Sequence, residues 1–427
     1  MTPWQISRKK NKMKIKIISL GCRLNQSEIE SISTSLQNAG HEITRGGYAD
    51  IYIINSCAVT TRSERKTRQL IYRALSATGR HAKEKIIVTG CAPEDISGDP
   101  RITYVSNDYK HMIPEIIKNL DSGMPEIRIS RFAFDTPVKC STNRVNLKIQ
   151  DGCDNFCSYC IIPHTRGKPQ SKPLQTVLDE FRELLDNGYK EIILTGVNLG
   201  KYSDEGYDLA DLTAKILSLN GEFRLHLTSL DPESASEKLL SLFREKKMVK
   251  HLHLSLQSGS NTVLRRMNRP YNRDEYIAAT KYLKTIDGFF NFTTDVIAGF
   301  PGETESEFED TLSLIKHVGF SHIHTFRYSP RPGTKAASMD DAVPENVKTA
   351  RSREIIRLFN EQKISYYKKF SGRDCLFLSE KFRNGVTTGF NEYYIPVEIP
   401  AKLPKNNFFT IRTIHENDNK VLTGTLI

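Results

Sequence analysis

Three cysteines stand at the ends of three short apolar runs in the first hundred residues. Cys22, Cys57 and Cys91 lie 35 and 34 residues apart, and each closes an apolar run through a turn of small residues. The runs are Lys16–Leu20, Ile51–Ile54 and Ile86–Val88, and stretches of helical character, Glu28–Ala39 and Ser63–Ala77, separate them. A strand–turn–helix unit that repeats every 35 residues or so predicts a parallel α/β sheet.

The carboxyl ends of such strands share one edge of the sheet, which is the usual ligand-binding edge. We therefore expect the three thiols to converge in space. Three thiolates are one ligand short of a closed zinc site, and they suit a 4Fe–4S cluster that keeps one iron open. Zinc with a histidine or aspartate as fourth ligand also fits these residues, and so do three buried cysteines that act as small hydrophobic side chains.

A second group of cysteines has a much tighter spacing. Cys153, Cys157 and Cys160 form a C-x3-C-x2-C run between a strand candidate, Val145–Ile149, and a helix candidate, Leu174–Asn187. This spacing lets three thiolates hold one cubane whose fourth iron stays open. A zinc ribbon would need a second pair of ligands at a defined spacing, and none follows. We interpret the nearby His164 as a loop residue.

Strand-like and helix-like segments alternate after these cysteines. The strands are expected at Glu191–Thr195, Arg224–Thr228, His251–Leu256, Phe292–Ile297 and His322–Phe326, and the helices at Leu209–Leu219, Ala235–Lys246, Arg273–Lys284 and Glu303–His317. With the Val145 strand, these make a partial (β/α)6 TIM-like barrel. Functional residues of such barrels lie at the carboxyl ends of the strands. There the sequence offers Thr195, Gly196, Asn198, Ser255, Gln257 and Gly299.

The last part of the chain, Ser371–Ile427, has no helical period. Four β-like runs predict a small antiparallel barrel: Cys375–Leu378, Tyr394–Ile399, Phe408–Ile414 and Val421–Thr425. The two remaining cysteines, Cys140 and Cys375, match no metal pattern and are interpreted as structural thiols.

Composition limits the class of protein and its partners. The chain has 427 residues, with 61 Lys and Arg against 50 Asp and Glu, a net charge of +11 that favours nucleic acid as partner. No apolar run approaches the roughly 18 residues of a spanning helix. The basic start, broken by Lys14 and Lys16, is not a secretory signal, and Met13 is a plausible alternative start. We therefore expect a cytoplasmic protein, away from membranes, whose cysteines serve metal binding or catalysis.

The C-x3-C-x2-C run resembles the signature of the radical S-adenosylmethionine (SAM) superfamily. In that superfamily the open iron chelates SAM, and one electron cleaves it to a 5′-deoxyadenosyl radical, because an unactivated hydrogen demands a reactive cofactor. The resemblance implies that Cys153, Cys157 and Cys160 hold this cluster and that the ring of Tyr159 lies against the adenine. It also implies that the strand ends named above form a SAM cradle.

The whole pattern, from about Met13 to Ile427, resembles the methylthiotransferase family. The matching motifs are Ser19–Gln26, Ile54–Thr60, Lys148–Cys153, Ile161–Gly167 and Arg327–Thr334. The resemblance implies an N-terminal α/β domain over 13–138, a radical SAM barrel over 139–370 and a TRAM-like β domain over 371–427. It further implies two 4Fe–4S clusters and two SAM molecules, one a methyl donor and one a radical source. Cys22, Cys57 and Cys91 would hold the auxiliary cluster that delivers sulfur.

Arg23-Leu24-Asn25 after the first cysteine resembles the branch that acts on N6-threonylcarbamoyladenosine. That branch methylthiolates ring carbon C2 of the tRNA adenosine next to the anticodon. The alternatives are isopentenyladenosine in tRNA, an aspartate of a ribosomal protein, and a non-catalytic Fe–S RNA-binding protein. The resemblance implies tRNA, an electron donor such as flavodoxin or ferredoxin, and a sulfur source as partners.

The expected RNA contacts follow the distribution of charge. Gly389–Val397 resembles the TRAM module, but the tail is nearly neutral and therefore a weak phosphate binder. The stretch Arg62–Lys85 carries eight Lys and Arg against two Glu. We expect RNA contacts there and at the cluster of Arg265, Arg266, Arg269 and Arg273. A solvated helix face is the alternative for each. One departure from the family pattern is Ser171-Lys172, where Ser-Arg is usual.

Overall fold

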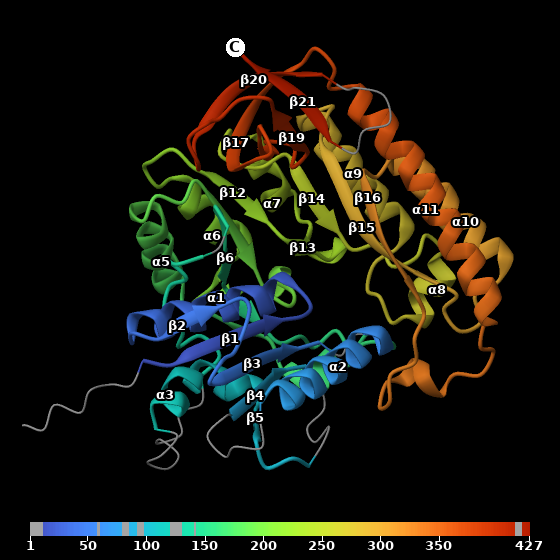
Figure 1. The fold of residues 1–427 in the computed structure, drawn as a ribbon. Helices are drawn as coiled ribbons and strands as arrows, with labels where there is room; N and C mark the ends of the chain where they lie inside the picture. Colours follow the sequence, from blue (N-terminus) through green and yellow to red (C-terminus); the bar gives the residue numbers. More distant parts are fainter. Residues whose placement is uncertain are drawn as a thin grey trace, which may run out of the picture. The chain divides into compact units, whose positions relative to one another are not determined.

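The computed structural model describes residues 12–57, 60–78, 85–91, 98–119, 130–140, 142–414 and 421–427. The chain divides into two compact units, Met1–Cys140 and Ser141–Ile427 (Figure 1). Residues 1–11, the pair Ala58-Val59 of the second cysteine motif and residues 79–84 of the basic stretch lie outside the described residues.

The first unit is built on a parallel sheet of five strands in the order β2-β1-β3-β4-β5. The strands are β1 (Lys14–Ser19), β2 (Glu42–Thr44), β3 (Ile51–Ser56), β4 (Lys85–Gly90) and β5 (Ile102–Val105). The helices are α1 (Arg23–Asn38), α2 (Thr61–Ala77), the 3-10 helix η1 (Asn107–Met112) and α3 (Ile113–Lys118). The predicted parallel α/β sheet is confirmed, and the short strands β2 and β5 are additional to the prediction.

Both faces of this sheet are covered. Ile51 and Ile53 of β3 pack against α1 and α3, whereas Tyr52 and Ile54 of the same strand pack against α2. Every residue of β3 is therefore buried. A strand buried on both faces reads as a continuous apolar run, which is why its position is visible in the sequence.

The second unit contains six parallel barrel strands, as predicted. They are β6 (Arg144–Lys148), β9 (Glu191–Thr195), β12 (Arg224–Leu227), β14 (His251–Leu254), β15 (Asn291–Ala298) and β16 (His322–Arg327). They form two sheets, β12-β9-β6 and β13-β14-β15-β16, in which β13 (Ser229–Leu230) directly continues β12. The short strands are β7 (Gln150–Asp151), β8 (Gln170–Ser171), β10 (Ser203–Asp204) and β11 (Tyr207–Asp208).

Helices follow the barrel strands and cover their outer side (Figure 1). They are α4 (Ile162–Arg166), α5 (Leu174–Asp186), α6 (Leu209–Leu217), α7 (Glu237–Ser241), α8 (Asn261–Arg266), α9 (Arg273–Ile286) and α10 (Glu305–Val318). The 3-10 helices are η2 (Leu199–Lys201), η3 (Pro232–Ser234), η4 (Leu242–Arg244) and η5 (Lys335–Ser338). The predicted helix Ala235–Lys246 is thus split into α7 and η4.

One long helix, α11 (Glu345–Lys368), was not expected from the sequence. It packs against β16 and α10. Its buried side includes Lys348 and Arg351, so the apolar period that marks a helix is broken. No helix in the described part of the chain, α11 included, is long and apolar enough to cross a membrane.

The chain ends in a closed five-stranded barrel. Its strands are β17 (Asp374–Arg383), β18 (Val386–Asn391), β19 (Pro396–Ile399), β20 (Phe408–Ile414) and β21 (Leu422–Leu426), in the order β17-β18-β19-β21-β20. The small β domain is confirmed, with two differences. Strand β18 was not predicted, and β19 pairs with β21 in parallel, whereas the other pairs are antiparallel.

This C-terminal barrel covers the amino end of the central barrel strands. Arg224, at the start of β12, donates from Nη2 to the carbonyl of Phe390 at 3.2 Å. The ring of Tyr394, in the turn between β18 and β19, lies 4.8 Å from the ring of His226 and 4.7 Å from that of His251. The turn therefore fills the space between the barrel strands at that end.

Candidate functional site

The strand register brings the ends of β1, β3 and β4 side by side. Ser56 of β3 pairs with Gly90 of β4, and the amide of Cys91 donates to the carbonyl of Ser56 at 3.3 Å. On the other side of β3, the amide of Leu20 donates to the carbonyl of Asn55 at 2.9 Å. Cys22, Cys57 and Cys91 thus follow three adjacent strand ends, with Cys57 in the middle.

Two glycines allow these turns to approach one another. Gly21 and Gly90 have φ of +101° and +104°, a backbone region that side chains rarely adopt. A Cβ on Gly90 would lie 2.4 Å from the carbonyl oxygen of Ser56, and one on Gly21 would lie 3.2 Å from Sγ of Cys57. The close approach of the three strand ends therefore depends on glycine. Cys57 and Cys91 are buried, whereas Cys22 is exposed.

A buried polar network lies directly beneath these cysteines. Asn25 donates to the carbonyls of Leu20 at 2.8 Å and Ser56 at 3.0 Å, and so ties two of the strand ends together. Lys110 pairs with Glu28 at 2.5 Å and donates to Oδ1 of Asn55 at 3.2 Å. Lys110 and Glu28 are fully buried, so neither charge is stable there without the other.

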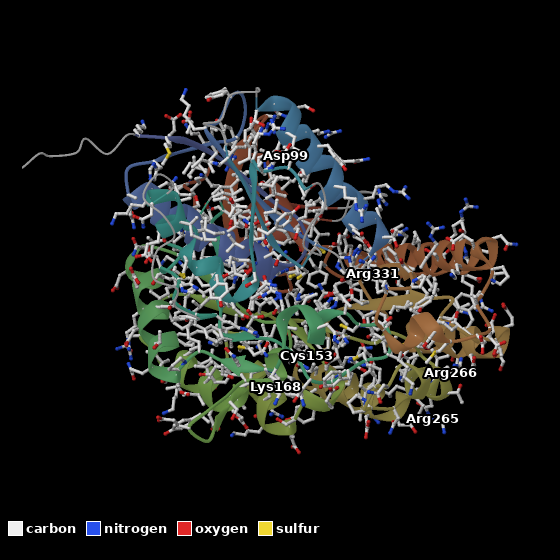
Figure 2. The ribbon with its side chains drawn as sticks, turned by 90° about the horizontal axis from the view of Figure 1, so that it is seen from below. Asp99, Cys153, Lys168, Arg265, Arg266 and Arg331 are labelled. Carbon is white, nitrogen blue, oxygen red and sulfur yellow. The ribbon has the colours of Figure 1, made fainter. Side chains whose placement is uncertain are left out.

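In the second unit, the loop after β7 carries the tightly spaced cysteines (Figure 2, where Cys153 is labelled). Gly152 has φ of +76°, and a Cβ there would lie 2.1 Å from the carbonyl oxygen of Lys168. The amide of Cys153 donates to the carbonyl of Gly167 at 3.0 Å. The chain entering the loop is thereby held against the chain that leaves it.

Buried charges brace this loop. Asp151 accepts from Lys148 at 2.7 Å and from Arg166 at 2.9 Å, and all three side chains are at most 5% exposed. Farther on, Lys172 pairs with Glu180 at 2.5 Å. Lysine therefore fills the buried position at which the family pattern usually has arginine. His164 is exposed on α4, so its interpretation as a loop residue is wrong.

Cys157 is buried, Cys153 and Cys160 are partly buried, and none of the described cysteines forms a disulfide. Burial raises the pKa of Cys160 to about 12, and it also raises the pKa of Cys153 and of Cys157. Thiols of this kind are protonated at neutral pH unless a metal replaces the proton. Cys153, Cys157 and Cys160 are therefore three thiols that would lose their protons when a metal ion binds.

Three polar side chains surround the thiols. Arg269 donates from Nη1 to Sγ of Cys157 at 3.1 Å and from Nη2 to Asp231. Asn198 donates to Oδ2 of Asp231 at 3.2 Å, and its Nδ2 lies 3.9 Å from Sγ of Cys153. Sequence reasoning missed Asp231 and gave Arg269 to RNA, because nothing in the sequence links a distant arginine to a cysteine loop.

The structure places the other predicted site residues around this loop and the neighbouring strand ends. Tyr159 packs with Phe300, their ring centroids 6.5 Å apart, inside an apolar group that includes Val263 and Ile297. Burial raises the pKa of Tyr159 well above its usual value, so its hydroxyl stays protonated. Tyr159 thus packs its aromatic ring against an apolar cluster at these strand ends.

Gly196 and Asn198 follow Thr195 at the end of β9. A Cβ on Gly196 would lie 2.9 Å from Cβ of Gln150, and the amide of Asn198 donates to Oε1 of Gln150 at 2.8 Å. Thr195 itself is buried, and its carbonyl accepts from the amide of Ile149 at 3.0 Å. These contacts join the end of β9 to the start of the cysteine loop.

Ser255, Gln257 and Gly299 lie at the ends of β14 and β15. Gln257 has φ of +61°, and its amide donates to the carbonyl of Asp295 at 2.8 Å. The carbonyl of Ser255 accepts from the hydroxyl of Tyr271 at 2.9 Å. Gly299 has φ of +72°, and its amide donates to the carboxylate of Glu303 at 2.7 Å. Gln257 thus holds a backbone conformation that residues other than glycine rarely adopt.

Three of the four arginines of the predicted cluster make contacts within the protein, and their assignment to RNA stays a prediction. Arg266 pairs with Glu307 at 2.7 Å, Arg273 donates to the carbonyl of Asp310 at 2.7 Å, and Arg269 contacts the thiols. Arg265 is exposed. Figure 2 labels Arg265 and Arg266.

Helix α2 does present a basic face. It begins four residues after Cys57, and its exposed residues include Arg62, Arg65, Lys66, Arg68 and Arg73. The ring of Tyr72 on the same helix is 54% exposed. Arginine and lysine neutralise phosphates, and an exposed aromatic ring can stack on a base.

A partial (β/α)6 barrel whose strand ends surround a C-x3-C-x2-C loop defines a radical SAM enzyme. Residues 147–315 match the family profile described as the radical SAM superfamily, and residues 14–100 match an uncharacterized protein family, UPF0004. The fold is shared with a radical SAM methyltransferase from Kitasatospora setae, solved with cobalamin and a 4Fe–4S cluster. That likeness has a TM-score of 0.53 and 11% identity, and it covers 88% of this chain and 80% of that one.

Sequence relatives identify the particular family. A threonylcarbamoyladenosine tRNA methylthiotransferase of Thermotoga maritima is 38% identical over 90% of this chain and 91% of its own. The enzyme of the same description from Bacillus subtilis is 34% identical over 89% of this chain and 88% of its own. A tRNA-2-methylthio-N(6)-dimethylallyladenosine synthase of Bdellovibrio bacteriovorus is 33% identical over 85% and 84%. The chain belongs to the radical SAM methylthiotransferases that act on tRNA, and membership implies a 4Fe–4S cluster and SAM.

Proposed function

We propose that this enzyme methylthiolates C2 of N6-threonylcarbamoyladenosine next to the tRNA anticodon, with one SAM as methyl donor and one as radical source. The observation that carries the proposal is the presence of two separate three-cysteine sets, one at the strand ends of each unit. Relatives described as acting on this nucleoside reach 38% identity, and Arg23-Leu24-Asn25 fits that branch. The isopentenyladenosine substrate is the second candidate, since relatives at 33% carry that description.

Two 4Fe–4S clusters fit these donor sets. Cys153, Cys157 and Cys160 would hold the SAM-binding cluster, and Cys22, Cys57 and Cys91 would hold the auxiliary one that delivers sulfur. Each set offers three thiols and leaves one iron position open. When bound, the first cluster and SAM supply the radical that abstracts an unactivated hydrogen.

The protein's own residues bind and orient these groups. Arg269 and Asn198 would donate to the cluster sulfurs, and hydrogen bonds of this kind set the reduction potential of a cluster. We assign the SAM cradle to the strand ends that surround the loop. It comprises Tyr159, Thr195, Gly196, Asn198, Ser255, Gln257 and Gly299. Tyr159 would supply an apolar ring surface for the adenine, and the positive-φ backbone at Gln257 and Gly299 would let the main chain approach the ligand.

We further infer that the three segments 13–138, 139–370 and 371–427 act as the sulfur-delivery, radical and TRAM-like RNA-binding domains. The basic face of α2 beside Cys57 would contact tRNA phosphates. A flavodoxin or ferredoxin would supply electrons, and a separate sulfur source would recharge the auxiliary cluster. We infer that the enzyme acts on tRNA in the cytoplasm.

Nucleoside analysis of tRNA tests the substrate. A deletion strain should lack the 2-methylthio form of threonylcarbamoyladenosine, and the wild-type chain should restore it. The triple variant Cys22→Ala/Cys57→Ala/Cys91→Ala should not restore it, yet should still cleave SAM and keep about four of about eight irons, as expected for one of two cubanes. Loss of the isopentenyladenosine product instead would favour the second candidate. Unchanged tRNA, or loss of SAM cleavage in the triple variant, would contradict the proposal.

The α2 contact is tested by the salt dependence of tRNA binding. Arg65→Ala and Arg73→Ala should each weaken binding and lower the slope of log K against log[salt] by about 1. The matched control is Arg182→Ala on α5, an exposed helix arginine paired with Asp179 at 2.7 Å. Equal slopes in all three variants and the wild type would remove α2 from the RNA interface.

A further inference from the structure

Two histidines and a carboxylate converge on neighbouring strands inside the central barrel. His253 of β14, Asp295 of β15 and His324 of β16 each offer a ligand atom, and these atoms all lie within 4.8 Å of one another. The register explains why: Asp295 pairs with His324, and His253 pairs with Thr293, two residues before Asp295 on the same strand face. None of these residues belongs to either cysteine set.

A second layer of side chains orients both imidazole rings. Nδ1 of His253 lies 3.0 Å from the hydroxyl of Thr293, and Nδ1 of His324 lies 3.2 Å from Nε2 of His322. In protein metal sites, a ligating histidine almost always has its other ring nitrogen engaged in this way, which fixes the tautomer and the ring orientation.

The hydrogen-bond chain behind His253 has a direction. Its far end is Glu191, which is 1% exposed and lies between Arg224 at 2.7 Å and Arg144 at 3.9 Å. These two guanidinium groups keep Glu191 ionised. An ionised carboxylate only accepts hydrogen bonds, and Nδ1 of His226 lies 3.7 Å from its Oε1. This contact is longer than a hydrogen bond, and the negative charge of Glu191 favours the His226 tautomer that carries its proton on Nδ1.

The proton position on His226 determines the donor and acceptor atoms of each ring that follows in this hydrogen-bond chain. Nε2 of His226 then accepts from Nδ1 of His251 at 2.9 Å, and Nε2 of His251 accepts from the hydroxyl of Thr293 at 2.9 Å. The Thr293 oxygen in turn accepts from Nδ1 of His253. A neutral imidazole has one N–H, so Nε2 of His253 is left with a lone pair.

This lone pair faces another acceptor. Nε2 of His253 lies 3.4 Å from Oδ2 of Asp295, and two acceptors at this distance need a cation between them. A bound proton would join these two atoms only. A metal ion would also explain why His324, whose ring is oriented by His322, converges on the same point.

We propose that His253, Asp295 and His324 form a mononuclear site for a divalent transition metal of the zinc class. Two imidazoles and one carboxylate suit such ions. Three protein ligands leave at least one coordination position open. The side chains of His253 and Asp295 are 13% and 29% exposed, so solvent reaches the site and water or another oxygen ligand can complete it. The proposal does not depend on which nucleoside the enzyme modifies.

The test uses the holoenzyme with its clusters assembled, so that the thiols are already occupied. After equilibrium dialysis against Zn²⁺, elemental analysis should find one zinc per chain at unchanged iron content. The zinc X-ray absorption spectrum should fit nitrogen and oxygen ligands at about 2.0–2.2 Å. His253→Ala, His324→Ala and the nearly isosteric Asp295→Asn should each lose this zinc.

The matched control is His317→Ala, which removes an exposed histidine on α10 and should leave the zinc in place. Thr293→Val keeps all three ligands and should weaken zinc binding 10- to 100-fold, the usual effect of losing an orienting partner. A zinc spectrum with sulfur ligands near 2.3 Å, zinc retained in the three ligand variants, or no zinc bound by the wild-type holoenzyme would each overturn the proposal. In the last case a shared proton between His253 and Asp295 accounts for the contact.

Discussion

Gly90 and Gly21 show how single residues set the geometry of the cysteine edge. Both have positive φ, and both sit where an added Cβ would press on the neighbouring strand end. Sequence alone located these turns through the cysteines that follow them. It could not reveal that the glycines also bring Cys22, Cys57 and Cys91 together, because the close contact is between strands 35 residues apart.

We predict that Gly90→Ala destabilises the first unit by about 3 kcal/mol or more, because it combines backbone strain with a clash against Ser56. The matched control is Gly40→Ala. Gly40 has φ of +92° but nothing within 4 Å of an added Cβ, so it should cost only about 1 kcal/mol. Hydrogen exchange of peptides from β3 would measure both. Equal protection in the two variants would contradict the role given to close approach.

At the scale of elements, Lys110 connects η1 to α1 and β3 beneath the cysteines. Lys110→Met would leave Glu28 buried without its partner, which typically costs about 3–5 kcal/mol. We predict lower hydrogen-exchange protection of β3 and loss of the iron held by the first cysteine set. The double variant Lys110→Met/Glu28→Gln should recover most of the protection, because the uncompensated charge is gone. A single variant as stable as the wild type would refute the coupling.

Helices α8 and α10 are joined by Arg266 and Glu307, which also makes the capping box of α10 with Thr304. Hydrogen bonds from Arg266 hold the pKa of Glu307 at about 2, below its usual 4.5. A lowered folded-state pKa stabilises the protein above the unfolded pKa, and this contribution disappears as pH falls from about 4.5 through 2.

Glu307→Gln keeps the capping box but removes the charge. We predict that it lowers the free energy of unfolding by about 1 kcal/mol at neutral pH, a value reduced by solvent screening of this partly exposed pair. The difference from the wild type should shrink between pH 4.5 and 2, as followed by urea denaturation of the cluster-free chain. A difference that grows on acidification would contradict the assigned sign.

Two elements that sequence reasoning missed, α11 and β18, include polar side chains among their buried residues. Helix α11 buries Lys348 and Arg351, and β18 buries Thr387, Gly389 and Asn391. Periodicity detects apolar faces, so these elements gave no signal. The strands β3 and β4 were visible because their residues are apolar on both faces.

At the scale of the whole molecule, some residues of the candidate site can be predicted from the sequence and others cannot. The six cysteines are found from spacing, because thiols are rare and their order reflects the strand ends. The histidines of β14 and β16 alternate with apolar residues, and that pattern reads as a strand with an outward polar face. In this barrel the polar face lies inside, where His226 and His251 meet across strands, and only the fold reveals their contact.

The C-terminal barrel is attached to the central barrel through Tyr394. We predict that Tyr394→Ala, which empties the space between the rings of His226 and His251, weakens this attachment by about 3 kcal/mol. The control is Asn384→Ala, an exposed turn residue of the same domain that shares a positive φ of 52° and should cost about 1 kcal/mol. Hydrogen exchange of β12 and β14 would report the difference, and equal protection in the two variants would argue against an anchoring role.

Because Tyr394 packs between strands at the amino end of the central barrel, the C-terminal domain is fixed in position at that end. These contacts involve residues at the start of β12 and β14, whereas the cysteine loop lies beyond the far end of the strands. From its first to its last residue, the five-residue strand β9 spans four steps between these two levels, roughly 13 Å at about 3.3 Å per step. An RNA bound by both the C-terminal domain and the strand ends would have to span this distance. We therefore expect the enzyme to select its target base by the distance between that base and the RNA segment bound at the C-terminal domain.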